Sequence, residues 1–115
     1  MDLVELVTQT FERYQDTESL RLVAADQTDD RLSVRVMGDR EYLVVMRVPR
    51  DEDDAEWTQY PATSMDDWVR YAVFYRVIEL HDTGILASQS ASTRSGEMSY
   101  TIPSAIDRAA KNTTT

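Results

Sequence analysis

The sequence has no cysteine, one lysine, one histidine, three glycines and three prolines among its 115 residues. The absence of cysteine excludes disulfides, thiolate zinc sites and cysteine nucleophiles. With so few glycines, the chain has no glycine-rich loop that would cradle a phosphate or a dinucleotide. No apolar run approaches the roughly 20 residues of a membrane-spanning helix. The first five residues include two acids and no basic residue, so we expect no signal peptide and a cytoplasmic protein.

Residues that could carry chemistry are scarce. A nucleophilic triad needs a base such as His81, but no Gly-x-Ser-x-Gly motif accompanies it. We interpret His81 as a residue at a helix end, where a positive charge complements the helix dipole. The acidic run at 51–54 lacks the alternating spacing and the glycine of a calcium loop, so we expect a solvated loop. Glu79, His81 and Asp82 have no second group of ligands nearby in sequence. We therefore predict no catalytic residue, no metal site and no cofactor.

Charge is the strongest signal in the composition. The formal net charge is -9, with 21 acidic residues against 12 basic ones. Eleven of the basic residues are arginines. A carboxylate-rich surface with almost no lysine is typical of a high-salt cytoplasm, where 1 M salt screens repulsion beyond about 3 Å. The alternative is a genome whose base composition favours arginine over lysine. In both cases the negative charge disfavours nucleic acid as a partner.

The hydrophobic pattern predicts one α+β domain over 1–111, followed by a flexible tail at 112–115. Apolar residues three and four apart predict helices, and alternating apolar residues predict strands. In chain order, we expect a helix over 2–14, a three-stranded antiparallel meander over 20–25, 31–36 and 41–48, a loop over 50–63, a long central helix over 64–81, a β-hairpin over 85–91 and 97–102, and a short C-terminal helix over 104–111. Gly84 should end the central helix.

The predicted central helix has two apolar faces. One face carries mainly aromatic residues, which we take as a candidate interface: Trp68, Tyr71, Phe74, Tyr75 and Ile78. The other carries Val69, Val73, Val77 and Leu80. A helix on the surface of a monomer needs a single apolar stripe. Either the helix is buried between the sheet and the other helices, or its aromatic face contacts a second subunit or a partner.

The predicted sheet offers a second candidate surface. Six of the 12 basic residues lie between Arg21 and Arg50. If the larger apolar residues face the helices, the opposite sheet face carries a patch formed by Arg21, Arg31, Arg35 and Arg47 beside Val23, Leu43 and Val45. Such a patch could receive an acidic or extended partner segment. Alternatively, the arginine stems cover the apolar residues and pair with Glu41 across the strands.

Residues 68–102 combine a long apolar helix, Gly84, and a hairpin that runs from Ile85-Leu86-Ala87 to Ser99-Tyr100-Thr101-Ile102 and leads into Pro103. With the preceding helix and meander, this order resembles the secretion-chaperone-like fold of type III secretion chaperones and related small acidic bacterial proteins. The resemblance covers almost the whole chain as topology, without a residue signature. It implies a small acidic dimer that binds client segments, has no catalytic residues, and uses the two-faced helix in its dimer.

Three functions are compatible with the sequence. The first is a non-catalytic, chaperone-like protein-binding module that self-associates as a homodimer and contacts neither nucleic acid nor membrane. The second is a structural component of a larger assembly, such as a virion tail or neck ring, which would make the chain virion-associated. The third is a small enzyme that depends on carboxylates or a metal. An acidic nucleic-acid mimic ranks below these, because the longest acidic run has four residues.

Overall fold

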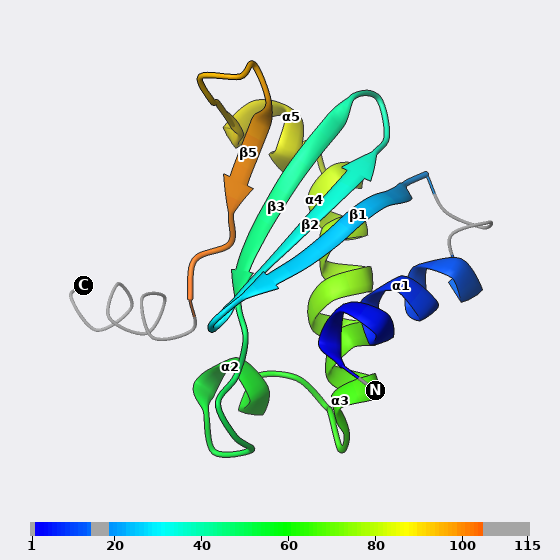
Figure 1. Cartoon of the computed structure of the whole chain (residues 1–115), viewed down its shortest axis with the longest axis vertical. Coiled ribbons are helices and arrows are strands. Elements are labelled where there is room, and N and C mark those ends of the chain that lie inside the picture. The colour runs from blue at the N-terminus through cyan, green and yellow to red at the C-terminus, as the bar shows by residue number, and fades with distance from the viewer. Residues whose placement is uncertain (1, 15–18, 105–115) are drawn as a thin grey trace.

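The computed structural model describes residues 2–14 and 19–104, which form the predicted α+β fold (Figure 1). The central helix is built from three consecutive segments, α3, η2 and α4, of which η2 is π-helical. The elements are α1 (Leu3–Tyr14), β1 (Arg21–Thr28), β2 (Arg31–Met37), β3 (Glu41–Arg47), α2 (Ala55–Thr58), α3 (Met65–Trp68), η2 (Val69–Tyr75), α4 (Arg76–Asp82), α5 (Ile85–Gln89), β4 (Ala91–Ser92) and β5 (Met98–Thr101).

The five strands form one mixed sheet in the order β1-β2-β3-β5-β4. The first three strands make the predicted antiparallel meander. The sequence did not indicate that β5 would lie parallel to β3, because this pairing needs the whole central helix as a crossover. Figure 1 shows α1 and the central helix on the same side of the sheet. The sheet therefore has an inner face, against the helices, and an outer face.

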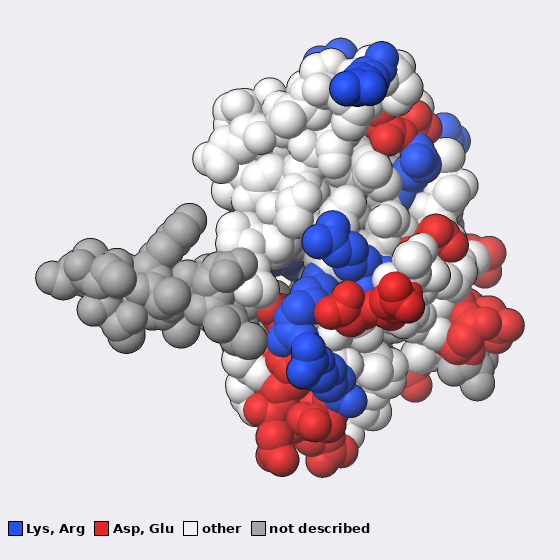
Figure 2. Space-filling model, turned by 60° about the vertical axis from the view of Figure 1, so that its left-hand side comes forward, with Lys and Arg blue, Asp and Glu red and all other residues white. Residues whose placement is uncertain are grey.

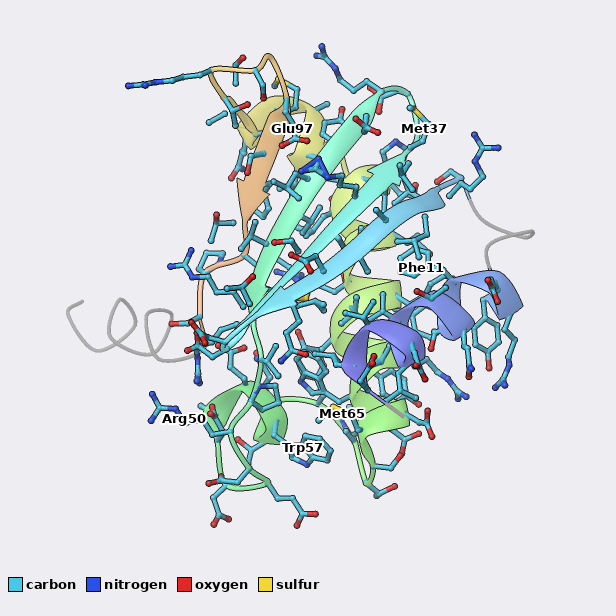
Figure 3. All side chains as sticks on the ribbon, viewed as in Figure 1. Phe11, Met37, Arg50, Trp57, Met65 and Glu97 are labelled. Carbon is cyan, nitrogen blue, oxygen red and sulfur yellow. The ribbon has the colours of Figure 1, made fainter. Side chains whose placement is uncertain are left out.

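Alternation along β2 and β3 places the core on the inner face, as predicted. Leu32, Val34 and Val36 of β2 are fully buried between half-buried or exposed neighbours. Tyr42, Val44 and Met46 of β3 follow the same pattern. Phe11 of α1 is also fully buried, packs edge to face on Phe74 at 4.9 Å between ring centroids, and lies on the sheet side of its helix (Figure 3).

The first strand departs from the predicted alternation at a β-bulge. The register of β1 against β2 shifts between Leu22 and Ala24, and Val23 in the bulge is 49% exposed. A bulge inserts one residue and so reverses which side chains face inward. Ala25 consequently packs against the core while Ala24 is exposed, so this strand does not keep the alternation that we expected.

Two predicted helix starts are confirmed by their caps. The Asp2 carboxylate accepts a 2.8 Å hydrogen bond from the Glu5 amide at the start of α1. At the start of α3, the Ser64 hydroxyl accepts from the Asp67 amide. The Asp67 carboxylate reaches back one residue further than in a standard capping box, because it accepts from the amide and hydroxyl of Thr63. These hydrogen bonds lower the pKa of Asp67.

The region after Gly84 is where the predicted elements are wrong. Residues 85–89 form α5 rather than a strand, and the hairpin is reduced to β4 and β5. Gly84 has a left-handed φ of 81° and ends α4 as predicted, but the chain then begins another helical turn and buries Leu86 completely. Of the predicted C-terminal helix, Ser104 has no regular structure, and 105–111 lie outside the described residues, as does the predicted tail at 112–115.

The predicted loop over 50–63 contains one short helix, α2, whose cap is Asp54. The Asp54 carboxylate accepts from the amides of Glu56 and Arg50 and forms an ion pair with Arg47. Trp68 donates its indole N–H to the Glu56 carbonyl at 2.9 Å. In Figure 3, Trp57 lies between α2 and the start of α3. An ion pair and a hydrogen bond therefore connect the loop to the sheet and to the central helix.

Candidate protein-binding surfaces

The first candidate surface is a hollow where α2 meets the central helix. It encloses about 320 Å³ and is lined by Gln59, Tyr60, Tyr71, Tyr75, Arg76 and Glu79, which we call the tyrosine face. The rings of Tyr71 and Tyr75 lie 6.1 Å apart, and Tyr75 is 44% exposed. Tyrosines are enriched in protein interfaces, because they combine a large apolar ring with a polar tip.

The five predicted interface residues divide between the core and this surface. Trp68, Phe74 and Ile78 are buried in the chain's own core, at 1%, 0% and 7% exposure. Tyr71 and Tyr75 reach the surface, half-buried and exposed respectively. The second set of apolar residues, which includes Val73 and Val77, is also fully buried. Both faces of the helix are thus mostly used within the chain, and of the five predicted residues the two tyrosines remain for an external contact.

Two members of the tyrosine face carry no signal in the sequence. Gln59 and Tyr60 fall in the segment that we expected to be a loop, and only α2 brings them beside the central helix. A short helix of four residues has too few apolar positions for a periodic pattern to reveal it.

The second candidate surface is the outer sheet face. Ser33 and Arg35 of β2 and Leu43 and Val45 of β3 all point to this side and are half-buried. Figure 2 shows the side of the molecule that carries β5, with several basic side chains in a narrow band, acidic residues beside this band and at its lower end, and a largely uncharged area above. The outer sheet face therefore combines apolar strand residues with guanidinium groups.

The four predicted patch arginines lie on the outer sheet face in different environments. Arg35 forms an ion pair with Glu97 of the β4–β5 connection, and Arg47 pairs with Asp54 and Glu56 of α2. The alternative in which these arginines pair with Glu41 is therefore wrong for both residues. Arg21 and Arg31 are exposed, and no ion pair links either of them to another described residue. Each arginine that pairs thus links the outer sheet face to a neighbouring segment of the chain.

Arg31 and Arg47 oppose each other directly across β2 and β3. Two like charges in this position repel, so the acids of α2 that neutralise Arg47 stabilise the strand pair. Burial alone would raise the pKa of Asp54, but hydrogen bonds from Arg47 and from the amides of Arg50 and Glu56 lower it to about 2. Our expectation that the acidic loop is solvated is thus wrong for its last residue, Asp54.

A shallow pocket of about 290 Å³ lies at the end of this arginine pair. Its lining joins the two arginines to the chain that follows β5, through Asp30, Arg31, Val45, Met46, Arg47, Thr101, Ile102, Pro103 and Ser104. The Arg47 Nε is buried without a hydrogen-bond partner among the described residues, although the Glu56 carboxylate lies 3.9 Å away. The positive charge in this pocket is offset by Asp30 and by the acids of α2.

His81 lies in a cluster of polar residues that the sequence did not predict. Its Nε2 is 3.0 Å from Asp39 Oδ1 and its Nδ1 is 3.1 Å from Asp82 Oδ1. The Ser19 hydroxyl donates to Asp82 at 2.7 Å and lies 3.3 Å from His81 Nδ1. Tyr42 donates to Asp39 at 3.1 Å. Our interpretation of His81 as a helix cap was therefore incomplete, because its ring also joins the β2–β3 turn to the start of β1.

The cluster contains the residue types of a serine hydrolase triad but not the arrangement. In a triad the serine donates to an imidazole nitrogen that can accept its proton. Here Ser19 donates to Asp82, and both nitrogens of His81 face carboxylate oxygens. Hydrogen bonds from Ser19 and His81 lower the pKa of Asp82. Because the Ser19 hydroxyl donates to Asp82 and the nearest partner of each His81 nitrogen is a carboxylate oxygen, the geometry favours a structural role for the ring.

Within the described ranges 2–14 and 19–104, no group of three or more histidine or acidic side chains is arranged to hold a metal ion. In the same part of the chain, every helix is too short or too polar to cross a bilayer. Comparisons with models of protein families, with curated proteins and with solved structures found no match to this chain.

Proposed function

We propose that this protein is a non-catalytic, chaperone-like binding module that holds an extended segment of another polypeptide on its outer sheet face. One observation carries the proposal: in the described part of the chain, helices cover only the inner face of the five-stranded sheet (Figure 1). Leu43 and Val45 remain half-buried at the centre of the open face. Apolar residues flanked by charged ones are the composition of a surface that takes a partner.

The order of elements supports the same proposal through its resemblance to secretion chaperones, which bind client segments without catalysis. The acidic composition suits a high-salt cytoplasm as the setting of this function. Arg21 and Arg31, which form no ion pair with another described residue, supply positive charge on this face for an acidic client segment. The structural role that we assign to His81 is consistent with a protein that binds rather than catalyses.

The proposal is tested by removing apolar contact while keeping strand propensity. The variant Leu43→Thr/Val45→Thr introduces threonine, whose β-branched side chain suits a strand. A matched control is Val4→Thr, the same type of change on α1. Each immobilised protein is exposed to the extract of its source cells, the retained polypeptides are identified, and the affinity of each is measured with the purified partner. We expect a partner that binds wild type and Val4→Thr alike and binds the double variant about tenfold more weakly or worse.

Equal binding to all three proteins would place the contact elsewhere. Absence of any partner in both low and molar salt would contradict the proposed function. Circular dichroism of the double variant shows whether the sheet is intact, so a loss of binding through unfolding is recognised.

A second candidate, a structural component of a larger assembly, is favoured by β1. This strand has eight residues and pairs only with β2 among the described strands, so its other edge is open to a further strand. Open edges promote association between sheets, although the bulge in β1 weakens such pairing. Electron microscopy of the concentrated protein would show rings or tubes if this candidate is correct, and discrete small particles if it is not.

A further inference from the structure

The cluster around His81 joins three segments that lie far apart in the sequence. His81 lies in the last turn of α4, Asp39 lies in the turn between β2 and β3, and Ser19 lies just before β1. Asp39 Oδ1 is 3.0 Å from His81 Nε2, and Ser19 donates to Asp82, the neighbour of His81 on the helix. The imidazole ring therefore connects the end of α4 to the β2–β3 turn.

The β2–β3 turn accommodates this ring closely. Gly38 has no side chain, and a Cβ at its position would lie 2.5 Å from His81 Nε2. The rings of His81 and Tyr42 lie edge to face with centroids 6.3 Å apart, and the Tyr42 hydroxyl donates to Asp39. The His81 side chain is still 16% exposed. The ring is thus held in one position and yet reaches solvent, so it exchanges a proton with water.

The two carboxylates beside the ring stay ionised near neutral pH. Burial alone would raise the pKa of Asp39, but hydrogen bonds from Tyr42 and His81 lower it. Hydrogen bonds from Ser19 and His81 lower the pKa of Asp82. Both groups therefore keep their negative charge over the whole range in which histidine side chains gain and lose a proton.

The other titratable and charged groups around the ring also keep their charge in this range. Burial and the hydrogen bond to Asp39 raise the pKa of Tyr42, so its hydroxyl stays neutral. Arg40, in the same turn, is exposed, and a guanidinium group does not lose its proton in proteins. Among the described groups of the cluster, the imidazole of His81 is therefore the one that titrates between about pH 5 and 8.

The charge of the ring determines how many of its contacts are favourable. A charged imidazole carries a hydrogen on each nitrogen, so it donates to Asp39 through Nε2 and to Asp82 through Nδ1. A neutral ring has one hydrogen, and its other nitrogen presents a lone pair to a carboxylate oxygen. The positive charge between the two carboxylates is lost at the same time. The contact between α4 and the turn therefore weakens when the ring releases its proton to solvent.

We propose that His81 is a pH-sensitive joint, which holds the end of α4 against the β2–β3 turn while its ring is charged and loosens this contact when the ring becomes neutral. The contact is complete at acidic pH and weakens as the pH rises through the range in which histidine titrates. The joint controls the mobility of the turn that connects β2 to β3. This inference goes beyond the proposed function and does not depend on it.

Hydrogen exchange in the full chain tests the proposal at the turn itself. The Gly38 amide donates to the Arg40 carbonyl at 3.0 Å, so its protection from exchange with solvent reports whether the turn is closed. NMR measures this protection relative to the exchange rate of an unstructured peptide at the same pH. The chain has one histidine, so its ring signals identify two pH values, one with the charged ring and one with the neutral ring.

Two variants remove the charged contact and keep side chains of similar size, His81→Gln and Asp39→Asn. The matched control is Asp29→Asn, which removes the same charge from the β1–β2 turn. Asp29 has a left-handed φ of 55°, a conformation that asparagine also adopts. Circular dichroism verifies that each variant is folded.

We expect the protection of Gly38 in wild type and in Asp29→Asn to fall about threefold or more when the ring becomes neutral. In His81→Gln and Asp39→Asn, protection should be lower than in wild type at the acidic pH and should lose most of its pH dependence. A purely structural role of His81 would lower protection in these variants but would leave wild-type protection equal at the two pH values.

Three results would overturn the proposal. One is equal wild-type protection with the charged and the neutral ring, a result that needs no variant to fold. Another is His81→Gln with the same pH dependence as wild type, which would place the titrating group elsewhere. The third is loss of the pH dependence in Asp29→Asn, which would assign the effect to net charge. None of these measurements includes a client, so the joint and the proposed function fail independently.

Discussion

At the residue scale, single acidic residues anchor loops to the sheet, and a glycine permits close packing at one turn. Asp54 combines three tasks, since it caps α2, pairs with Arg47 and accepts from the Arg50 amide. In Figure 3, Arg50 itself extends outward beside α2. The neighbouring Asp53 is exposed. The acidic run therefore contains one structural carboxylate among surface acids, and composition alone could not distinguish them.

The pKa of Asp54 makes this distinction measurable. Its value of about 2 in the folded chain lies below the ordinary value of 3.8, so the folded state gains stability as Asp54 loses its proton. That contribution is complete above about pH 5 and is lost as the pH falls through 4 towards 2. We expect Asp54→Asn to lower the free energy of unfolding at pH 7 by about 2 kcal/mol and to flatten its dependence on pH below 4. Urea unfolding across this pH range measures both effects.

Asp53→Asn is the control for that experiment, because it removes the same charge from an adjacent side chain that forms no ion pair with another described residue. We expect its free energy of unfolding to stay within about 0.5 kcal/mol of wild type. Equal losses for the two variants would mean that Asp54 acts only through the net charge of the loop.

Gly38 illustrates a residue whose role depends on close approach. A Cβ at this position would lie 2.5 Å from His81 Nε2 and 2.7 Å from Leu20 Cδ2. The ring would have to leave Asp39, and Leu20 is only 2% exposed. We predict that Gly38→Ala lowers the free energy of unfolding by about 1–3 kcal/mol. Unfolding by urea measures the loss, and unchanged stability together with an unchanged NMR signal of His81 would contradict this placement.

At the element scale, the helix caps were predictable and the sheet contacts were not. The Ser64 cap is a local signal in the sequence. A serine followed three residues later by an acidic residue marks the start of a helix, and both residues lie within one helical turn. The parallel pairing of β5 with β3 joins residues about 56 positions apart, such as Tyr42 and Met98. The bulge at Val23 and the helical turn after Gly84 likewise follow from packing that no short pattern encodes.

The same difference applies to the candidate surfaces. Periodicity identified Tyr71 and Tyr75 but could not tell them from Trp68, since all are aromatic residues on one side of the helix. Trp68 is buried against α2 whereas Tyr75 is exposed. The sequence could not show this difference, because α2 itself was not predicted. Arg31, Arg35 and Arg47 share the outer sheet face because β2 and β3 alternate strictly. Their partners could not be predicted, because Glu97 and Glu56 come from elements that approach the sheet only in the folded chain.

The Ser64 cap predicts the stability of the central helix. Its hydroxyl satisfies the Asp67 amide at 3.3 Å, and an amide in the first helical turn has no partner within its own helix. We expect Ser64→Ala to lower the free energy of unfolding by about 1 kcal/mol, and Ser64→Thr to cost less, because threonine also caps. Thermal unfolding followed by circular dichroism measures both. Equal losses for alanine and threonine would argue against the cap.

At the scale of the whole molecule, the net charge of -9 opposes the compact state. Repulsion between surface carboxylates weakens as added salt shortens the screening length, from about 10 Å at 0.1 M to about 3 Å at 1 M. We predict that the midpoint of urea unfolding rises between about 0.1 and 1 M KCl for the same chain. A midpoint that is unchanged or falls would contradict high salt as the setting to which this composition is adapted.

The two candidate surfaces lie in different layers of the molecule. The helical layer presents the tyrosine face, and the sheet layer presents the outer sheet face. This arrangement makes the outer sheet face the part of the molecule on which the proposed function depends.

Hydroxyl-radical footprinting tests that dependence most directly, because it reports the solvent access of individual side chains in the intact protein. The chain is labelled alone and with the partner that it retains. If the client lies on the outer sheet face, labelling of Leu43, Val45 and the exposed Met37 falls several-fold, while labelling of Val4 and Leu6 on α1 is unchanged. Protection confined to the helical layer, with Leu43 and Val45 labelled as before, would contradict the proposed client surface.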